Sequence, residues 1–333
     1  MEGQRLVRER SEKYVTVHTL KKYSNGLRWS KPDNDEQKQR GRSIESVLLP
    51  PTNDGYDNGA KEILDDCKRF LLDEEFYNDQ GTPHRRGYLL HGVPGSGKSS
   101  LVMALASELQ VPIYWLQLSA EGLSDETLVQ QLQAIRARPC VLLLEDVDRS
   151  HKAAREEDLN KELFEHETAV STQTSQDNNT SNGMLTTSGL LNAVDGPGAP
   201  TGILLFMTTN NLHKLDKALI RSGRIDVRVE FKYVDDEQVK RLVRRFYGFV
   251  YKGRSEQEHV EQISSCISQA IIHVGEKLTA ADIHGYLFRY KEVPYQAWKN
   301  VGELGGTKAK LWNMLCSEVV SPQKCTCIGS LSL

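Results

Sequence analysis

Short apolar runs without alternation are separated by segments of helical periodicity through the middle of the chain. The runs are Tyr88–Leu90, Ile113–Leu116, Val141–Leu144, Ile203–Met207 and Val227–Phe231. Near-continuous apolar sequence is typical of strands that are covered by helices on both faces of a parallel sheet. Between the second and third runs, Leu128, Leu132 and Ile135 recur at helical spacing. The pattern therefore predicts an α/β domain built on a parallel sheet.

The segments on either side of this α/β pattern differ from it. Tyr14–Leu20 is rich in β-branched residues and precedes a turn at Asn25-Gly26, which indicates β structure. After Phe231 the periodicity is helical only, and capping boxes at Ser255 and Thr279 mark the starts of helices. We expect a partial N-terminal β-rich segment over residues 1–57, an α/β domain over 58–231, a helical domain over 232–299 and a loose tail over 300–333.

A polar segment interrupts the α/β pattern between its third and fourth apolar runs. Residues 151–183 are first charged and then rich in Ser, Thr, Asn and Gln. Such a segment buries too little apolar surface to offset the entropy lost on ordering. We expect a disordered surface insertion, and the alternative is a regulatory or partner-binding loop.

Composition and charge exclude several classes of function. The formal net charge of the 333 residues is −3, which gives no electrostatic attraction to nucleic acid or to anionic lipid. No apolar stretch approaches the roughly 18 residues of a membrane span, and residues 1–13 resemble neither a secretory signal nor a transit peptide. Six scattered cysteines indicate reduced thiols, so these features alone predict a soluble intracellular chain.

A glycine-rich segment joins the first apolar run to a helical pattern that begins at Ser100. Its residues are Gly92, Val93, Pro94, Gly95, Ser96, Gly97, Lys98 and Ser99. Glycines at this spacing let backbone N–H groups surround phosphate oxygens at the positive end of the following helix. Lys98 would reach the terminal phosphates, and the Ser99 hydroxyl would bind Mg²⁺. The segment, with Ser100, therefore predicts a nucleoside triphosphate site; a chance glycine-rich turn is the alternative.

Polar side chains follow the third and fourth apolar runs directly. Glu145 and Asp146 come after Leu144, where P-loop ATPases place the carboxylates that hold the metal and activate water. Glu145 would steady the magnesium shell, and Asp146 would orient or deprotonate the attacking water; a purely structural pair is the alternative. Asn210 follows the fourth run and would contact the γ-phosphate or that water, unless it only caps the next turn.

Two arginines stand three positions apart, far along the chain from the glycine-rich segment. They are Arg221 and Arg224, within Leu215–Asp226. An arginine that reaches a γ-phosphate stabilises the charge of the transition state. Taken alone, such a pair is more often a solvated surface.

Together these motifs resemble the AAA ATPase family. The resemblance implies a P-loop NTPase fold with a parallel sheet, in which residues 232–299 form a helical lid domain. It also implies ATP and Mg²⁺ as cofactors, ATP hydrolysis, and Asn210 as the sensor asparagine. Arg221 and Arg224 would be arginine fingers that enter the site of a neighbouring subunit, which implies a ring.

A narrower resemblance rests on Arg86–Leu90, on the order of Glu145-Asp146, on Ser188–Gly196 and on Phe206–Asn210. These stretches are similar to the Bcs-type mitochondrial AAA chaperones, over about Tyr14 to Tyr290. The family inserts the folded Rieske iron–sulfur protein into respiratory complex III. The resemblance implies a homo-oligomer of six or seven subunits, a protein client and no nucleic acid. It implies a place on the matrix face of the mitochondrial inner membrane, reached through a segment absent from this chain.

Ser119–Ser124, where unfoldases carry an aromatic pore loop, has no aromatic residue, and this favours folded cargo over an extended chain. The alternatives are a nucleotide-binding scaffold with negligible turnover and a soluble AAA remodelling ATPase with another client. A P-loop kinase is less favoured, because it would not need Asn210 or the paired arginines.

Overall fold

The computed structural model describes residues 14–24, 26–30, 39–50, 58–135, 139–148, 185–196, 198–221, 223–250, 257–274 and 277–304. The predicted insertion at 151–183, Ser255 of one predicted capping box and residues 305–333 of the predicted tail lie outside this description. The chain divides into two compact units. The first contains Met1–Val47, Ala60–Gly92 and Lys98–Glu230, and the second contains Leu48–Gly59, Val93–Gly97 and Phe231–Leu333. The domain boundaries that we expect at 57, 231 and 299 stay a prediction.

The elements up to residue 231 alternate between strands and helices after a β-rich start. In chain order they are β1 (Tyr14–Val15), β2 (Val17–Tyr23), β3 (Gly26–Trp29), β4 (Gln39–Arg40), the 3-10 helix η2 (Ile44–Ser46), α1 (Gly59–Leu72), α2 (Glu74–Asp79), β5 (Arg85–Gly92), α3 (Lys98–Leu109), β6 (Ile113–Gln117), α4 (Asp125–Gln133), β7 (Cys140–Glu145), α6 (Thr187–Asp195), β8 (Ile203–Thr209), η3 (Leu212–Lys214) and β9 (Val227–Phe231).

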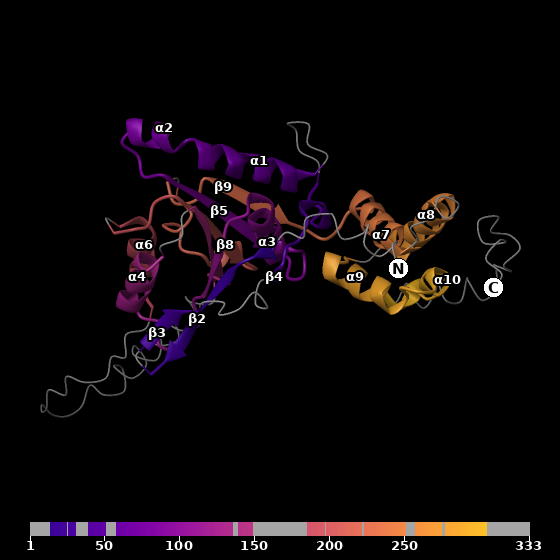
Figure 1. Ribbon diagram of the computed structural model, residues 1–333. Coiled ribbons are helices and arrows are strands. Elements are labelled where there is room, and N and C mark those ends of the chain that lie inside the picture. Colours follow the sequence, from indigo (N-terminus) through magenta and orange to yellow (C-terminus); the bar gives the residue numbers. More distant parts are fainter. Residues whose placement is uncertain are drawn as a thin grey trace, which may run out of the picture. The chain divides into compact units, whose positions relative to one another are not determined.

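One sheet organises this part of the chain (Figure 1). Its strand order is β3-β2-β6-β7-β8-β5-β9. The β2–β6, β6–β7, β7–β8 and β8–β5 pairs are parallel, and β2 and β3 form an antiparallel hairpin. The predicted parallel α/β sheet is therefore confirmed. In this order β8 lies between β5 and β7, so the segments that follow these three strands meet at one edge of the sheet.

Strands β2 and β3 of the N-terminal segment join this sheet, whereas β1 and β4 form a separate two-stranded sheet. β2 pairs with β6 through Val17 and Ile113, and β3 returns beside β2. Two hydrogen bonds fix the hairpin to α4: Trp29 Nε1 donates to the Gln131 carbonyl at 2.9 Å, and Gln131 Nε2 donates to the Leu27 carbonyl at 2.8 Å. The hairpin thus extends the sheet beyond β6.

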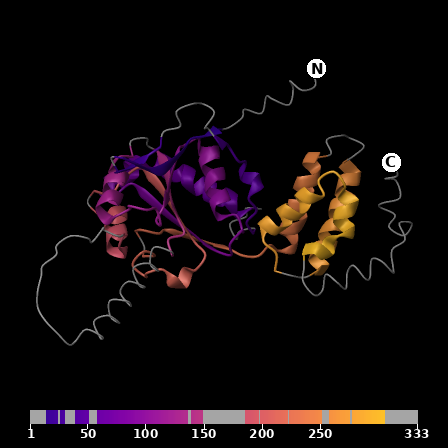
Figure 2. The ribbon, with the colours of Figure 1, turned by 90° about the horizontal axis from the view of Figure 1, so that it is seen from below.

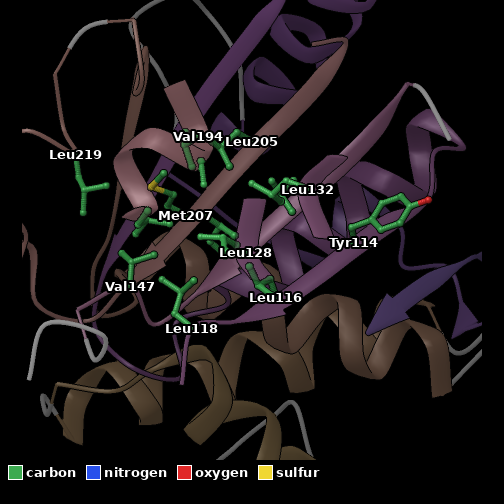
Figure 3. Close-up of a cluster of buried hydrophobic side chains, with 14 of the residues drawn as sticks. Tyr114, Leu116, Leu118, Leu128, Leu132, Val147, Val194, Leu205, Met207 and Leu219 are labelled. Carbon is green, nitrogen blue, oxygen red and sulfur yellow. The ribbon is translucent and has the colours of Figure 1, made fainter. Parts of the chain in front are cut away.

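An apolar core lies between one face of the sheet and the helices α4 and α6 (Figure 3). Leu128 and Leu132 of α4 and Val194 of α6 point toward Leu116 and Met207 of the strands. Burial of each such side chain contributes about 1.5–3 kcal/mol. A capping box at Ser124 begins α4, because the Ser124 hydroxyl accepts from the Thr127 N–H and the Thr127 hydroxyl accepts from the Ser124 N–H.

The opposite face of the sheet carries α1 and α3. Tyr88 of β5 stacks on Phe206 of β8 with ring centroids 4.5 Å apart, and its hydroxyl donates to Asp66 of α1 at 2.7 Å. α3 begins at Lys98, directly after the glycine-rich segment. The two helices therefore cover the face on which Glu145 and Trp115 also lie, since side chains alternate along a strand.

The second unit is helical in its C-terminal part, with α7 (Asp236–Val250), α8 (Gln257–Val274), α9 (Ala280–Arg289), α10 (Pro294–Lys299) and η4 (Val301–Leu304). Figure 2 shows these orange and yellow helices side by side. Val243, Tyr247, Ile267 and Leu287 are buried in their common core. The predicted capping box at Thr279 is present, with Asp282 as its third helical residue.

Within the described part of the chain, no helix combines the length and the apolar character that crossing a bilayer requires.

Gly87 allows a close backbone approach inside the sheet, and we predict that it does not tolerate a side chain. A Cβ at this position would lie 1.8 Å from the Arg224 carbonyl oxygen, which belongs to the backbone and cannot rotate away. Gly87→Ala should lower the free energy of unfolding by about 3 kcal/mol, measured by urea denaturation. Gly285→Ala is the control, because Gly285 is exposed in α9 with open space around it. It should raise stability by about 0.5–1 kcal/mol. Wild-type stability of Gly87→Ala would contradict the packing.

Candidate nucleotide-binding site

The glycine-rich segment connects β5 to α3 through backbone conformations that favour glycine. Gly95 has a φ of 76° and Gly97 a φ of 106°, both in the left-handed region. The Ser96 hydroxyl donates to the Val93 carbonyl at 2.6 Å and stabilises the turn. α3 begins at Lys98, and the first N–H groups of a helix have no partner within it. The segment therefore presents backbone donors at the positive end of a helix, as phosphate binding requires.

Lys98 is buried, with 8% of its surface exposed. Its Nζ donates to the Gly92 carbonyl at 2.9 Å and to Asn210 Oδ1 at 2.8 Å. Burial lowers the pKa of Lys98 below its ordinary value, and the nearby carboxylates Asp146 and Asp148 oppose this shift. A buried ammonium group among oxygen atoms is suited to bind an anionic phosphate, since the anion favours its charged form.

Asn210 joins the two halves of the site. It follows β8, the strand between β5 and β7. Its Oδ1 accepts from Lys98, and its Nδ2 donates to Asp146 Oδ1 at 3.4 Å. The order of the strands thus brings together three residues that the sequence singles out from separate segments.

Glu145 lies at the end of β7 and contacts the start of α3. Its Oε1 accepts a hydrogen bond from the Ser99 hydroxyl, and its Oε2 accepts one from Trp115 Nε1 at 3.1 Å. A hydroxyl and a carboxylate are hard oxygen ligands of the kind that Mg²⁺ prefers. Among the described residues no group of three or more His, Cys, Asp or Glu could hold a metal ion. Ser99 and Glu145 are the residues that could hold an Mg²⁺ ion here.

Asp146 has an unusual backbone conformation. Its φ of 50° lies in the left-handed region, which a non-glycine residue rarely adopts. The Asp146 N–H donates to the Thr208 hydroxyl at 3.2 Å, and the Val147 N–H donates to the Thr208 carbonyl at 3.0 Å. Contacts to β8 thus hold a conformation that costs of order 1–3 kcal/mol, as is common at functional sites.

Sequence reasoning missed the role of Asp148 in supporting these residues. Its Oδ1 accepts from the Thr209 hydroxyl at 2.8 Å and its Oδ2 from Asn211 Nδ2 at 3.0 Å. Burial alone would raise the pKa of Asp148, but the hydrogen bonds from Asn211 and Thr209 hold it below its ordinary value. Asp148 therefore fixes the residues on both sides of Asn210. Its position two residues after Asp146 was the available signal.

The structure does not bring Arg221 and Arg224 to this cluster within the chain. Arg224 lies by the first residues of β5, where its Nε donates to Asp195 Oδ2 at 2.9 Å and its Nη1 to the Ala218 carbonyl at 2.6 Å. Arg85, the first residue of β5, also pairs with Asp195. The length of β5 separates Arg85 from Gly92 by about 23 Å, at roughly 3.3 Å per residue. Arg221 is exposed.

Comparison with known proteins gives the same indication as the geometry. The model of the ATPase family associated with various cellular activities (AAA) matches residues 88–233. The chain is 34% identical over 312 residues to the probable mitochondrial chaperone BCS1-B of Dictyostelium discoideum, covering 91% of this chain and 62% of that protein. It is 36% identical over 267 residues to the mitochondrial chaperone BCS1 of Danio rerio, covering 80% of this chain and 56% of that protein.

The human mitochondrial chaperone BCS1 is 34% identical over 266 residues, again covering 80% of this chain and 56% of that protein. The chain thus spans between about half and two thirds of the length of these relatives. The AAA match covers the glycine-rich segment, the strand-end carboxylates, Asn210 and both arginines. The chain therefore belongs to the AAA ATPase family, with the sequence of a BCS1-type member.

Proposed function

We propose that this chain binds ATP with Mg²⁺, hydrolyses it, and acts in a ring on a protein client. The observation that carries the proposal is the contact of Lys98 with Asn210, and of Asn210 with Asp146, beside the Ser99–Glu145 pair. A phosphate-binding lysine, a metal-binding pair and a water-activating carboxylate at one edge of a sheet are the parts that ATP hydrolysis needs.

Each residue has a distinct task in this proposal. Gly92–Ser100 surrounds the phosphates with N–H donors, and Lys98 places its charge against the terminal ones. Ser99 and Glu145 hold Mg²⁺, which supplies charge neutralisation on the phosphates when it is bound. Asp146 orients the attacking water and accepts its proton, and Asn210 holds that water or the γ-phosphate. The strained backbone of Asp146 supports this assignment, since it fixes the direction of the carboxylate.

We assign the two arginines different roles in the ring. Arg221 is exposed, whereas Arg224 is bound to Asp195, so Arg221 is the better candidate to enter a neighbouring subunit's site. Arg224 is bound to Asp195 and to the Ala218 carbonyl, which fixes the loop that carries Arg221. Burial alone would raise the pKa of Asp195, but hydrogen bonds from Arg85 and Arg224 hold it below its ordinary value. Asp195 therefore stays ionised between two guanidinium groups.

The relatives support a proposal for the client and the location. Proteins named mitochondrial chaperone BCS1 are similar to most of this chain, so we propose a mitochondrial chaperone. The finer proposal is insertion of the Rieske iron–sulfur protein into complex III at the matrix face of the inner membrane. A homo-oligomeric ring of six or seven subunits, with C-terminal helices that act as a lid, completes it.

The two strand-end carboxylates should separate binding from turnover. Asp146→Asn removes the proton acceptor and should keep ATP affinity while it lowers steady-state phosphate release by about a hundredfold or more. Glu145→Gln should instead raise the Mg²⁺ concentration that turnover requires. Phosphate release and calorimetric ATP binding are measured for both variants. If Glu145→Gln stops turnover at saturating Mg²⁺ while Asp146→Asn does not, the two roles are reversed.

Replacing Arg221 and replacing Arg224 should have different effects on phosphate release and on thermal stability. Arg221→Ala should lower phosphate release by on the order of a thousandfold with unchanged thermal stability. Arg224→Ala should lower thermal stability as well, because it leaves part of the Asp195 charge without a partner.

Mixing Arg221→Ala subunits with Lys98→Ala subunits should restore activity, since intact sites then form between unlike neighbours. No recovery on mixing, with mixed oligomers confirmed by mass spectrometry, would contradict a role in trans.

A further inference from the structure

Trp115 lies on the strand next to the strand-end carboxylates. It belongs to β6, which pairs with β7 so that Trp115 lies opposite Leu143 and Gln117 opposite Glu145. Alternate side chains share a face of a sheet, so Trp115 and Glu145 are diagonal neighbours on the face that also carries α3. The indole Nε1 donates to Glu145 Oε2 at 3.1 Å, a contact between residues 30 positions apart in sequence.

Each carboxylate oxygen of Glu145 has a hydrogen-bond donor. Oε1 accepts from the Ser99 hydroxyl, and Oε2 accepts from Trp115. A glutamate has one more rotatable bond than an aspartate and loses more side-chain entropy when it is fixed. Two donors on its two oxygens restrict the carboxylate to one orientation, with Oε1 toward the start of α3.

The chemistry of the indole suits this task. An indole N–H is a donor only, and it carries no charge. A lysine or an arginine in the same place would neutralise the carboxylate and compete with a metal ion. Trp115 fixes the direction of Glu145 and leaves its negative charge available to a cation.

We propose that Trp115 is a positioning residue for the magnesium site: it holds Glu145 so that one carboxylate oxygen faces the Ser99 hydroxyl. The inference rests on the proposed function, because it assigns Glu145 to the Mg²⁺ that accompanies ATP. It adds a residue from the neighbouring strand, outside the motifs that the sequence singles out. Since the indole donates to Glu145, a change at this carboxylate should alter the emission of Trp115.

The direct test is Trp115→Phe, which keeps an aromatic ring and removes the N–H donor. ATP affinity is measured by calorimetry with excess Mg²⁺ and with EDTA. The variant should weaken ATP binding about three- to tenfold in Mg²⁺ and leave the affinity in EDTA unchanged, since a hydrogen bond to a charged group is lost only from the metal site. A general structural defect would weaken binding in both buffers.

Trp29→Phe is the matched control. Trp29 also donates an indole hydrogen bond, to the Gln131 carbonyl at 2.9 Å, but it lies in β3 and packs against Tyr114 on the other face of the sheet. This variant should leave the Mg²⁺-dependent gain in ATP affinity at the wild-type value. An equal loss in both variants would overturn the inference.

A double-mutant cycle tests whether Trp115 acts through Glu145. In a Glu145→Gln background, Trp115→Phe should add no further change in the Mg²⁺-dependent affinity.

Tryptophan emission gives a measurement that needs no change at Trp115. Adding Mg²⁺ to the ATP-bound wild type should shift the emission, and Glu145→Gln should remove this shift. Even if Trp115→Phe does not fold, a wild-type emission that Mg²⁺ leaves unchanged would overturn the link between Trp115 and Glu145.

The outcomes separate the two proposals. A wild type that binds no ATP in either buffer overturns both. A wild type whose ATP affinity rises with Mg²⁺, together with a Trp115→Phe variant that keeps the whole rise, overturns the role of Trp115 alone. Additive effects in the double-mutant cycle overturn it as well.

Discussion

The buried charge of Lys98 is the constraint on which the rest of the site depends. An ammonium group with 8% of its surface exposed needs oxygen partners, because its desolvation is otherwise uncompensated. The fold supplies them from two sides: the Gly92 carbonyl at the end of β5 and Asn210 Oδ1 at the end of β8. Since β8 lies between β5 and β7, the same asparagine also contacts Asp146. Strand order therefore converts three distant segments into one polar cluster at the edge of the sheet.

The surrounding residues keep this cluster in one arrangement. Asp148 fixes Thr209 and Asn211 on either side of Asn210, and Thr208 holds the unusual backbone of Asp146. Glu145 is fixed from the start of α3 and from β6. At the opposite end of β5, Asp195 binds two arginines and fixes the loop that carries Arg221. A rigid cluster and a separately supported exposed arginine are what catalysis between neighbouring subunits would require.

Sequence alone predicted the parallel sheet, because its strands are continuous apolar runs. It also predicted a phosphate-binding segment, because the glycine spacing is specific, and that role stays a prediction. It did not reveal the hydrogen bond from Trp115 to Glu145, which depends on the register of β6 against β7. It also gave no basis for the Arg224–Asp195 pair, since those residues are 29 positions apart. The β-branched run before residue 24 indicated strands, but only the parallel pairing of β2 with β6 shows that they extend the central sheet. Short-range sequence patterns predict local structure, whereas the pairing of strands across the sheet depends on the whole fold.

The central claim is that the residues around Lys98 form a site for ATP and Mg²⁺. Calorimetric titration of ATP with Mg²⁺ into the wild type and into Lys98→Ala tests it most directly, with the exposed Lys68→Ala as a control. We predict saturable binding to the wild type and to Lys68→Ala, and affinity weaker by about a hundredfold or more in Lys98→Ala. No heat of association with the folded wild type, or equal affinity in Lys98→Ala, would contradict the account.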